Sequence, residues 1–237
     1  MDTMMKRAGC WAAGAALMLA VSGVHAQTSL LTEADRQQLG AWLGDSSVQF
    51  NSLFTKQAGS TAQDFHAAAD GMGRTVMLVE ATNKAGETFL LGGYNPQSWS
   101  STDGYHMTGA DGERTAFLFN LTSGRLHRQM LNGVGTEMIG AYQTLNDPDS
   151  GPTFGWGHDF QMSADLTTGY SLLYSYADGD LSNLNRSLAD GTEFTGLDDL
   201  RYGRMEIYTL SPAPEPEQFI LLAAGLAVLV IARRRQR

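Results

Sequence analysis

Two side chains capable of acid–base chemistry stand next to each other in the second half of the chain, His158 and Asp159. A histidine beside a carboxylate can bind a cation or transfer protons, so the pair is a candidate functional site. The pair immediately precedes an expected strand that begins at Phe160, and adjacent strand residues point to opposite faces of a sheet. We therefore expect the two side chains to diverge, and a structural role is the main alternative.

Two aspartate pairs, Asp147-Pro-Asp149 and Asp178-Gly-Asp180, have the spacing of carboxylates that can hold calcium. An EF-hand loop needs a glycine at its sixth position and a glutamate at its twelfth, and neither segment supplies them. A looser calcium site and a simple solvated turn stay open as alternatives. His66 lies on an expected short helix, where capping or packing is the expected role.

Three aromatic residues in loop-like segments, Trp99, Tyr105 and Trp156, are expected at the surface, where their rings can stack on sugars. Extracellular polysaccharide is therefore a candidate ligand, although sandwich cores use the same residue types. The chain has no G-x-S-x-G motif and no evident serine triad. We expect a binding or protective protein with no cofactor, no metal and no assigned catalytic residue. The alternative is an extracellular hydrolase of envelope or matrix material, with His158, Asp159 or Glu206 as acid–base groups.

The charge and cysteine content exclude several classes of function. The formal net charge is −9 over 237 residues, and removal of both expected processing segments would take away six basic and three acidic residues, leaving about −12. Such an acidic domain repels phosphate backbones, so we expect no nucleic-acid partner. The only cysteine is Cys10, which lies in the segment expected to be removed. Disulfides and thiolate metal sites are thereby excluded from the exported form.

The first 26 residues have the three regions of a secretory signal peptide. Lys6 and Arg7 precede an apolar stretch from Ala8 to Val24, and the small-x-small pattern of Val24-His25-Ala26 follows. We predict cleavage by signal peptidase between Ala26 and Gln27. The chain is therefore expected to be exported.

The last 27 residues combine a proline-rich segment, an apolar run from Phe219 to Ala232 and a cluster of terminal arginines. Alternating prolines hold an extended backbone, and an apolar run of this length is short for a stable membrane span. This order resembles the PEP-CTERM sorting signal of Gram-negative bacteria, with Pro214-Glu215-Pro216 as its motif. The resemblance implies an exosortase partner, an inner-membrane intermediate held by the C-terminal helix, and delivery to the cell surface or extracellular matrix.

Between the two ends, residues 27–210 are expected to form one domain, followed by the sorting segment 211–237. Capping residues and apolar periodicity predict two short helices, Thr32–Leu43 and Ala62–Ala69. Alternating or β-branched runs predict strands at 48–54, 75–81, 88–94, 115–121, 125–131, 138–142, 160–162 and 203–210, with a long loop at 95–113 and irregular structure at 165–195. We predict a mainly β, α+β fold, with two antiparallel sheets packed as a sandwich.

Five segments in order resemble the TLDc domain. They are D-F-H-A-A-A-D-G at 64–71, F-L-L-G-G-Y-N-P-Q-S-W at 89–99, A-F-L-F-N-L at 116–121, G-P-T-F-G-W-G-H-D-F at 151–160 and the final strand at 203–210. The resemblance implies a β-sandwich flanked by short helices, in agreement with the pattern of elements. Known members are eukaryotic proteins tied to protection from oxidative stress and to the vacuolar proton pump. An exported bacterial domain would not come into contact with that pump, so we do not expect this role here.

Overall fold

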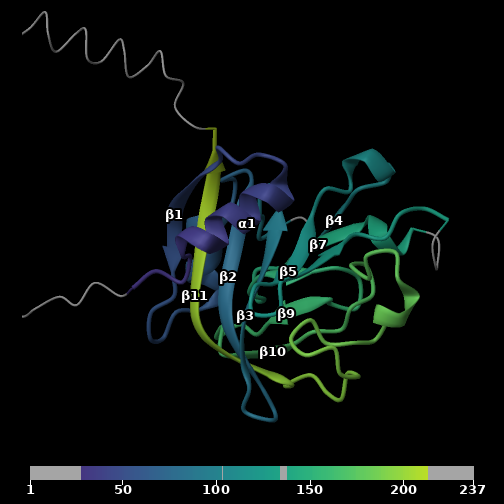
Figure 1. Cartoon of the computed structure of the whole chain (residues 1–237). Helices are drawn as coiled ribbons and strands as arrows, with labels where there is room; N and C mark the ends of the chain where they lie inside the picture. The colour runs from purple at the N-terminus through teal and green to yellow at the C-terminus, as the bar shows by residue number, and fades with distance from the viewer. Residues whose placement is uncertain (1–27, 103, 134–137, 213–237) are drawn as a thin grey trace, which may run out of the picture.

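The computed structural model describes residues 28–102, 104–133 and 138–212 (Figure 1). The predicted cleavage site at Ala26 and Gln27, the motif Pro214-Glu215-Pro216 and the apolar run Phe219–Ala232 lie outside the described residues. Within the described ranges, no helix has the length and apolar character that crossing a membrane requires. Export and sorting therefore stay predictions from the sequence.

Two short helices have the limits that their capping residues predict. Helix α1 (Glu33–Leu43) begins after Thr32, whose hydroxyl accepts the Asp35 N–H at 3.2 Å while the Asp35 carboxylate accepts the Thr32 N–H at 3.0 Å. It ends at Gly44, which has a left-handed φ of 71°. Helix α2 (Ala62–Ala69) begins with a capping box of the same kind. Such reciprocal caps satisfy the free N–H groups of the first turn, so the local sequence fixes both starts.

The fold is mainly β with two short α-helices, which confirms the predicted fold class. The strands are β1 (Gln49–Thr55), β2 (Thr75–Asn83), β3 (Thr88–Asn95), β4 (Gly104–Met107), β5 (Phe117–Asn120), β6 (Arg125–Arg128), β7 (Tyr142–Asn146), β8 (Thr153–Phe154), β9 (Phe160–Met162), β10 (Thr168–Tyr170) and β11 (Leu200–Ser211). All pairings between these strands are antiparallel, in the order β4-β7-β8-β9-β10-β11-β2-β3-β5-β6, with β1 also paired to β11. One hydrogen-bonded sheet thus bends into the two layers of a sandwich.

The long strand β11 is where the sheet divides. Along one edge it pairs with β2 from Leu200 to Thr209. Along its other edge it pairs with β10 at Leu200 and Arg201, and then with β1 from Glu206 onward. The register shifts between Tyr202 and Met205, next to the point of exchange. A local irregularity of this kind lets one strand serve two differently oriented parts of a sheet.

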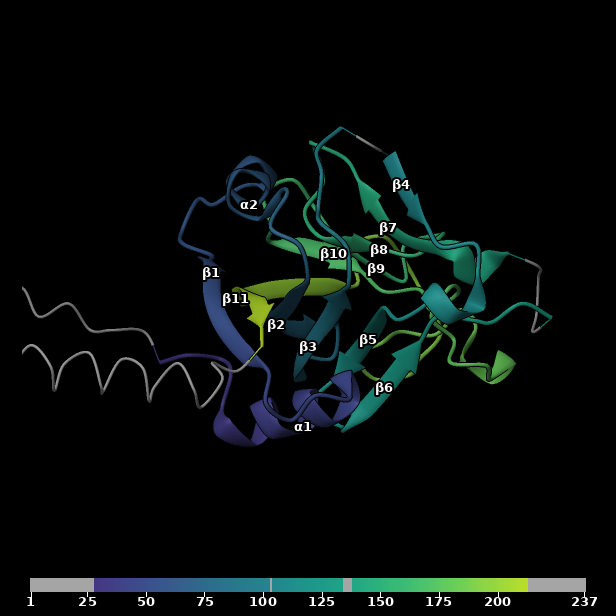
Figure 2. The same cartoon turned by 90° about the horizontal axis from the view of Figure 1, so that it is seen from above.

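Strand β2 is buried on both faces and separates two apolar cores. Met77 and Val79 face the core shared with Phe65 and Phe154, whereas Val76 and Leu78 face the core beneath α1. Figure 2 shows α1 and α2 on opposite sides of β2, β3 and β11. A strand covered on both faces reads as a continuous apolar run, which explains the unbroken pattern of residues 76–79.

The paired glycines of β3 allow this close packing. A Cβ atom on Gly92 would lie 2.1 Å from the Met77 carbonyl oxygen and 2.4 Å from the Phe119 ring. A Cβ atom on Gly93 would lie 2.6 Å from the Phe154 ring. Any larger residue would force the neighbouring strand or rings away, so the two glycines are needed for packing rather than for chemistry.

The structure corrects three details of the sequence prediction. The expected loop at 95–113 contains strand β4 and a 3₁₀ turn at Asp111–Glu113, and the expected strand at 138–142 is instead a 3₁₀ turn at Ile139–Ala141 followed by β7. Trp99 is buried rather than exposed. Its indole N–H donates to Thr75 Oγ1 at 2.9 Å, and its ring lies 5.3 Å from those of Phe65 and Phe154. A partnered N–H lets the largest apolar ring enter the core.

Candidate functional site

A tight turn between β8 and β9 carries His158, Asp159 and Trp156. Gly155 and Gly157 have positive φ angles of 78° and 80°, a conformation that costs glycine little. A Cβ atom on Gly155 would lie 1.9 Å from Asp159 Oδ2, so the turn closes tightly over this carboxyl group. The sequence G-W-G-H-D therefore forms a turn rather than the start of a strand.

Asp159 lies beneath this turn and is fully buried. Its Oδ1 accepts the backbone N–H groups of Tyr174 and Tyr176, each at 2.6 Å, and so joins the turn to the segment after β10. Oδ2 has no hydrogen-bond partner among the described residues. Burial raises the pKa of Asp159 to about 7, against the opposing effect of the backbone N–H donors. Asp159 therefore holds the turn in place and is not open to solvent.

Above the turn, three aromatic rings form a surface cluster that we call the aromatic platform: Tyr105, Tyr142 and Trp156. The Trp156 ring centroid lies 4.6 Å from that of Tyr142 and 5.5 Å from that of Tyr105, and the two tyrosine rings are 5.2 Å apart and nearly perpendicular. Trp156 is 43% exposed. An exposed indole supported by two rings is a rigid, preformed contact surface.

His158 completes one side of the platform. Its Nε2 lies 3.4 Å from the Tyr105 hydroxyl, and its Nδ1 lies 2.8 Å from the Tyr170 hydroxyl. Burial lowers the pKa of His158, with Asp147 opposing that effect. The imidazole is therefore neutral at pH 7, with one ring nitrogen able to donate and the other to accept. The structure thus places His158 among tyrosine hydroxyls and places Asp159 below, facing backbone amides.

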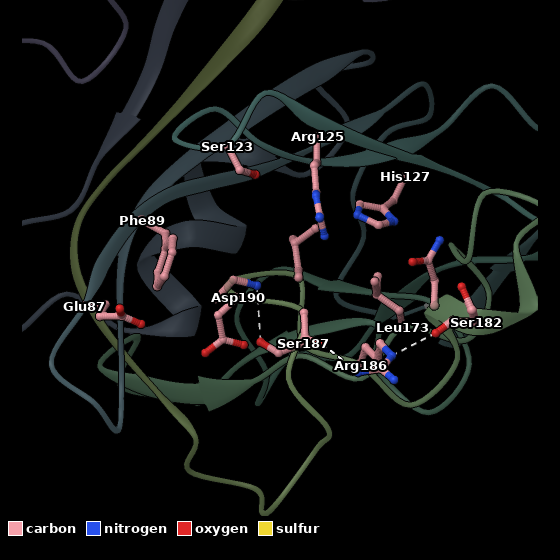
Figure 3. Close-up of a pocket in the computed structure, with 14 residues that line it drawn as sticks. Glu87, Phe89, Ser123, Arg125, His127, Leu173, Ser182, Arg186, Ser187 and Asp190 are labelled. Carbon is pink, nitrogen blue, oxygen red and sulfur yellow. Dashed lines mark hydrogen bonds between the residues drawn. The ribbon is translucent and has the colours of Figure 1, made fainter.

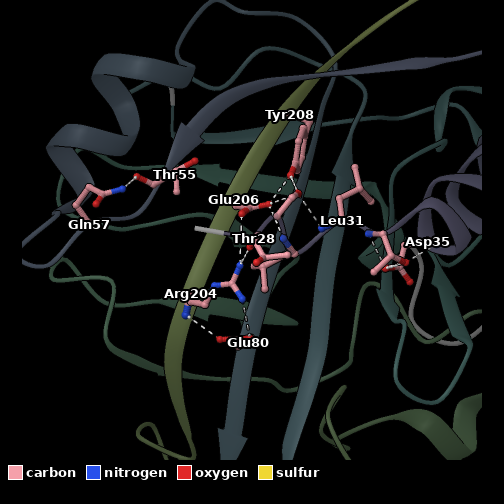
Figure 4. Close-up of polar contacts among 12 residues, drawn as sticks. Thr28, Leu31, Asp35, Thr55, Gln57, Glu80, Arg204, Glu206 and Tyr208 are labelled. Carbon is pink, nitrogen blue, oxygen red and sulfur yellow. Dashed lines mark hydrogen bonds and ion pairs between the residues drawn. The ribbon is translucent and has the colours of Figure 1, made fainter. Parts of the chain in front are cut away.

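Glu206, the other acid–base candidate, lies on β11 and shares no hydrogen-bond partner with His158 or Asp159. Its Oε2 accepts the Leu30 N–H at 3.0 Å and the Ser29 hydroxyl at 3.0 Å, and it also accepts a hydrogen bond from the Tyr208 hydroxyl. Figure 4 shows these contacts beside Arg204, whose Nη2 donates to the Thr28 carbonyl. Glu206 therefore fastens the first described residues to the sheet, and the three residues do not form one acid–base site.

His66 links α2 to the loop before β8. Its Nδ1 lies 2.8 Å from Asp70 Oδ1, and its Nε2 lies 2.9 Å from the Asp147 carbonyl oxygen. With 6% exposure and its ring against Phe65, it packs the helix end against the loop.

The aspartate pairs form turns. Asp147 accepts the Asp149 N–H at 3.1 Å and the Ser150 hydroxyl at 3.0 Å, and Asp180 accepts the Ser182 N–H at 2.9 Å. Within the part of the chain that the structure describes, no three His, Cys, Asp or Glu side chains gather as a potential metal site. These carboxylates stabilise local backbone turns.

The sequence analysis singled out Tyr105 and Trp156 but missed Tyr142 and Tyr170. Tyr142 opens a strand whose start was misplaced, and its ring meets Trp156 only because β7 pairs with both β4 and β8. Tyr170 lies on the three-residue strand β10 in a segment expected to be irregular. Neither residue has a local signal for its role, because these contacts depend on strand order rather than on sequence spacing.

The comparison with protein families agrees with this architecture. The profile of the TLDc domain matches residues 24–211, which is most of the chain. The chain therefore belongs to the TLDc domain family, and the resemblance of its five segments is confirmed. Among curated proteins, none matches the sequence.

Proposed function

We propose that this chain is an exported protein that is sorted to the cell surface or extracellular matrix, where its TLDc domain binds polysaccharide. The observation that carries the binding proposal is the aromatic platform, with its exposed indole and two supporting tyrosines. Aromatic faces pack against the apolar C–H face of a sugar ring, and the adjacent hydroxyls of Tyr105 and Tyr170 suit its hydroxyl groups. No covalent step is needed for this function.

The binding experiment uses the full chain and polysaccharide isolated from the host's own matrix. Trp156→Ala removes the exposed ring and is expected to weaken binding about tenfold, the equivalent of about 1.4 kcal/mol. Leu197→Ala is the control because Leu197 is an exposed apolar side chain outside the platform, at 65% exposure. Equal binding by Trp156→Ala and the unchanged chain would reject the platform as the binding surface.

The sorting experiment is independent of the ligand. Intact-mass analysis of the host's envelope fractions is expected to find a species that starts at Gln27 and ends before Phe219, outside the cytoplasmic membrane. Replacing Pro214-Glu215-Pro216 by alanines is expected to leave unprocessed protein in the inner membrane. Release of that variant at normal size would contradict exosortase sorting, while leaving the binding proposal intact.

A further inference from the structure

A cavity separate from the platform lies between strand β6 and the segment 181–191. Its volume is about 630 Å³, within the range of about 300–1,000 Å³ typical of small-molecule sites. Figure 3 shows Arg125 and His127 on one wall, Arg186 and Ser187 on the facing segment, and Phe89 at one end. None of the platform residues lines it.

Strand alternation directs two nitrogen-bearing side chains of β6 into this cavity. Arg125 and His127 are two residues apart, so their side chains share one face of the strand, and both line the cavity. Arg128 projects from the other face and lines a different surface, next to Trp42 and Phe117. The strand thus presents one arginine to the cavity and a second arginine away from it.

His127 lies in this wall with little of its surface exposed. The residue is 6% exposed, and its Nδ1 has no partner among the described residues. Burial lowers the pKa of His127 and keeps the imidazole neutral at pH 7; Asp178 opposes this effect and Arg125 adds to it. His127 therefore contributes a neutral ring to the cavity wall, while its unpartnered Nδ1 is closed off from the cavity.

Arg125 is a cation that the domain leaves unpaired. No described residue forms an ion pair or a side-chain hydrogen bond with its guanidinium. The two carboxylates that line the cavity keep their charge but form no ion pair with Arg125, and their hydrogen bonds come from neutral groups: Glu87 accepts Asn83 Nδ2 at 2.9 Å, and Asp190 accepts the same amide at 2.8 Å and the Thr192 hydroxyl at 2.7 Å. In a strongly acidic domain, an arginine without a carboxylate partner is an available site for an anion.

Arg186 supplies a second guanidinium with a fixed orientation. Its Nε donates to the Ser182 carbonyl at 2.8 Å and its Nη1 to the Gly191 carbonyl at 3.0 Å, so backbone oxygens hold the group in place. The remaining lining combines the hydroxyl groups of Ser123 and Ser187 with the apolar side chains of Phe89 and Leu173. The cavity could thus hold a ligand with three features. Its guanidinium groups suit a ligand carboxylate, its serine hydroxyls suit ligand hydroxyls, and its apolar side chains suit the carbon atoms of a ligand ring.

We propose that this cavity binds a sugar acid, with the ligand carboxylate against Arg125 and His127 and its ring between Phe89 and Leu173. The guanidinium of Arg125 provides the charge-assisted contact, and the ring of His127 forms the wall beside it. This site is independent of the aromatic platform and of export, because it uses neither the platform rings nor the chain ends.

The test is an NMR titration of the full chain, labelled with ¹⁵N-histidine, at pH 7 in a detergent without a sugar headgroup. The probe is D-glucuronate, and D-glucose is its neutral counterpart. Loss of one pair of imidazole signals in His127→Gln identifies His127. Glucuronate is expected to shift those signals saturably, and glucose is expected to bind at least tenfold more weakly.

Two charge-neutralising variants on the same strand test the guanidinium contact. Arg125→Gln is expected to weaken glucuronate binding at least tenfold, and Arg128→Gln is expected to leave it within twofold of the unchanged chain. The imidazole signals that remain in His127→Gln serve as the check that both variants are folded. Equal weakening by the two variants would overturn the proposal, because it would mean that only overall charge matters.

Two further outcomes would overturn the proposal. Glucuronate is added to about 50 mM, a concentration that would saturate a site with a millimolar dissociation constant. If the His127 signals do not shift under these conditions, the cavity does not bind sugar acids. Acetate binding as tightly as glucuronate would mean that the ring contacts with Phe89 and Leu173 contribute nothing, and the assignment to a sugar acid would then be wrong.

Discussion

Two buried carboxylates, Asp159 and Glu206, hold different parts of the molecule in different ways. Glu206 accepts hydrogen bonds from a backbone amide and two hydroxyls, and Arg204 Nη2 lies 3.8 Å from its other oxygen. Asp159 accepts two amides through one oxygen and has neither a cation nor a partner for the other oxygen within the described ranges. The carboxylate with more partners fastens the segment before α1 to the sheet. The carboxylate with fewer partners supports a surface turn, at a cost in stability that depends on pH.

Gly155→Ala is expected to have the largest effect on this comparison, because it presses directly on Asp159. The new Cβ would lie 1.9 Å from a carboxyl group whose other oxygen is held by two backbone amides, and φ at this position is 78°. We expect a loss of about 4 kcal/mol in the free energy of unfolding, measured by urea denaturation. Gly124→Ala is the control: its φ is 68° but nothing lies near its Cβ, so a loss of about 1 kcal/mol is expected. Similar losses in both variants would contradict the close approach.

Asp159→Asn is expected to change how stability depends on pH. Burial holds the folded-state pKa at about 7, above the ordinary value of 3.8, so the folded protein binds the extra proton between these values. The contribution of this group to the free energy of unfolding therefore falls by about 1 kcal/mol per pH unit as pH rises from about 4 to 7. Above pH 7 the contribution is constant. The uncharged amide removes that slope. Urea denaturation between pH 4.5 and 8 measures it, and an unchanged slope in the variant would show that Asp159 is ionised throughout.

Glu206→Ala tests the better-partnered carboxylate. It leaves the Leu30 amide and the Tyr208 hydroxyl without their acceptor, and we expect a loss of about 2 kcal/mol in unfolding free energy. Hydrogen exchange at the Leu30 amide is expected to accelerate, while polysaccharide binding stays unchanged. Glu80→Ala removes a partly exposed carboxylate that lies 3.7 Å from Arg204 Nη1 and accepts the Arg204 backbone N–H at 3.4 Å, so its expected loss is about 1 kcal/mol. Reduced polysaccharide binding in Glu206→Ala would show that the two regions are coupled.

Tyr105→Phe is expected to have the smallest effect and divides the platform into ring and hydroxyl contributions. The lost contact, 3.4 Å to His158 Nε2, is long for a hydrogen bond. We therefore expect the free energy of unfolding to fall by less than about 0.5 kcal/mol. Tyr170→Phe removes the 2.8 Å contact to Nδ1 and is expected to cost about 1 kcal/mol. Thermal unfolding of the two variants measures the difference. A larger loss of stability for Tyr105→Phe than for Tyr170→Phe would contradict the expectation that the Tyr170 hydroxyl makes the stronger contact with His158.

The sequence was sufficient where structure depends on neighbouring residues. Thr32 and Thr61 mark both helix starts because a cap is a local hydrogen bond, and the β2–β3 hairpin follows from two apolar runs around a short turn. The sequence did not predict the bending of one sheet at β11, because a strand that changes partners has no local signature.

The candidate site shows the same division. Tyr105 and Trp156 were recognisable as aromatic residues in glycine-rich segments, but their contact with Tyr142 requires the pairing of β4, β7 and β8. The role of Glu206 depends on Leu30, which is 176 positions away in the chain. Spacing along a sequence gives no indication of such partners.

Strand β11 also determines how the domain responds to mechanical force. Its last residues are hydrogen-bonded to β1 on one edge and β2 on the other, with Phe50 opposite Leu210 and Thr75 opposite Thr209. A pull along the axis of β11 would load both rows of hydrogen bonds in shear at the same time. Strand β11 is therefore the element that would share such a load between its two neighbouring strands.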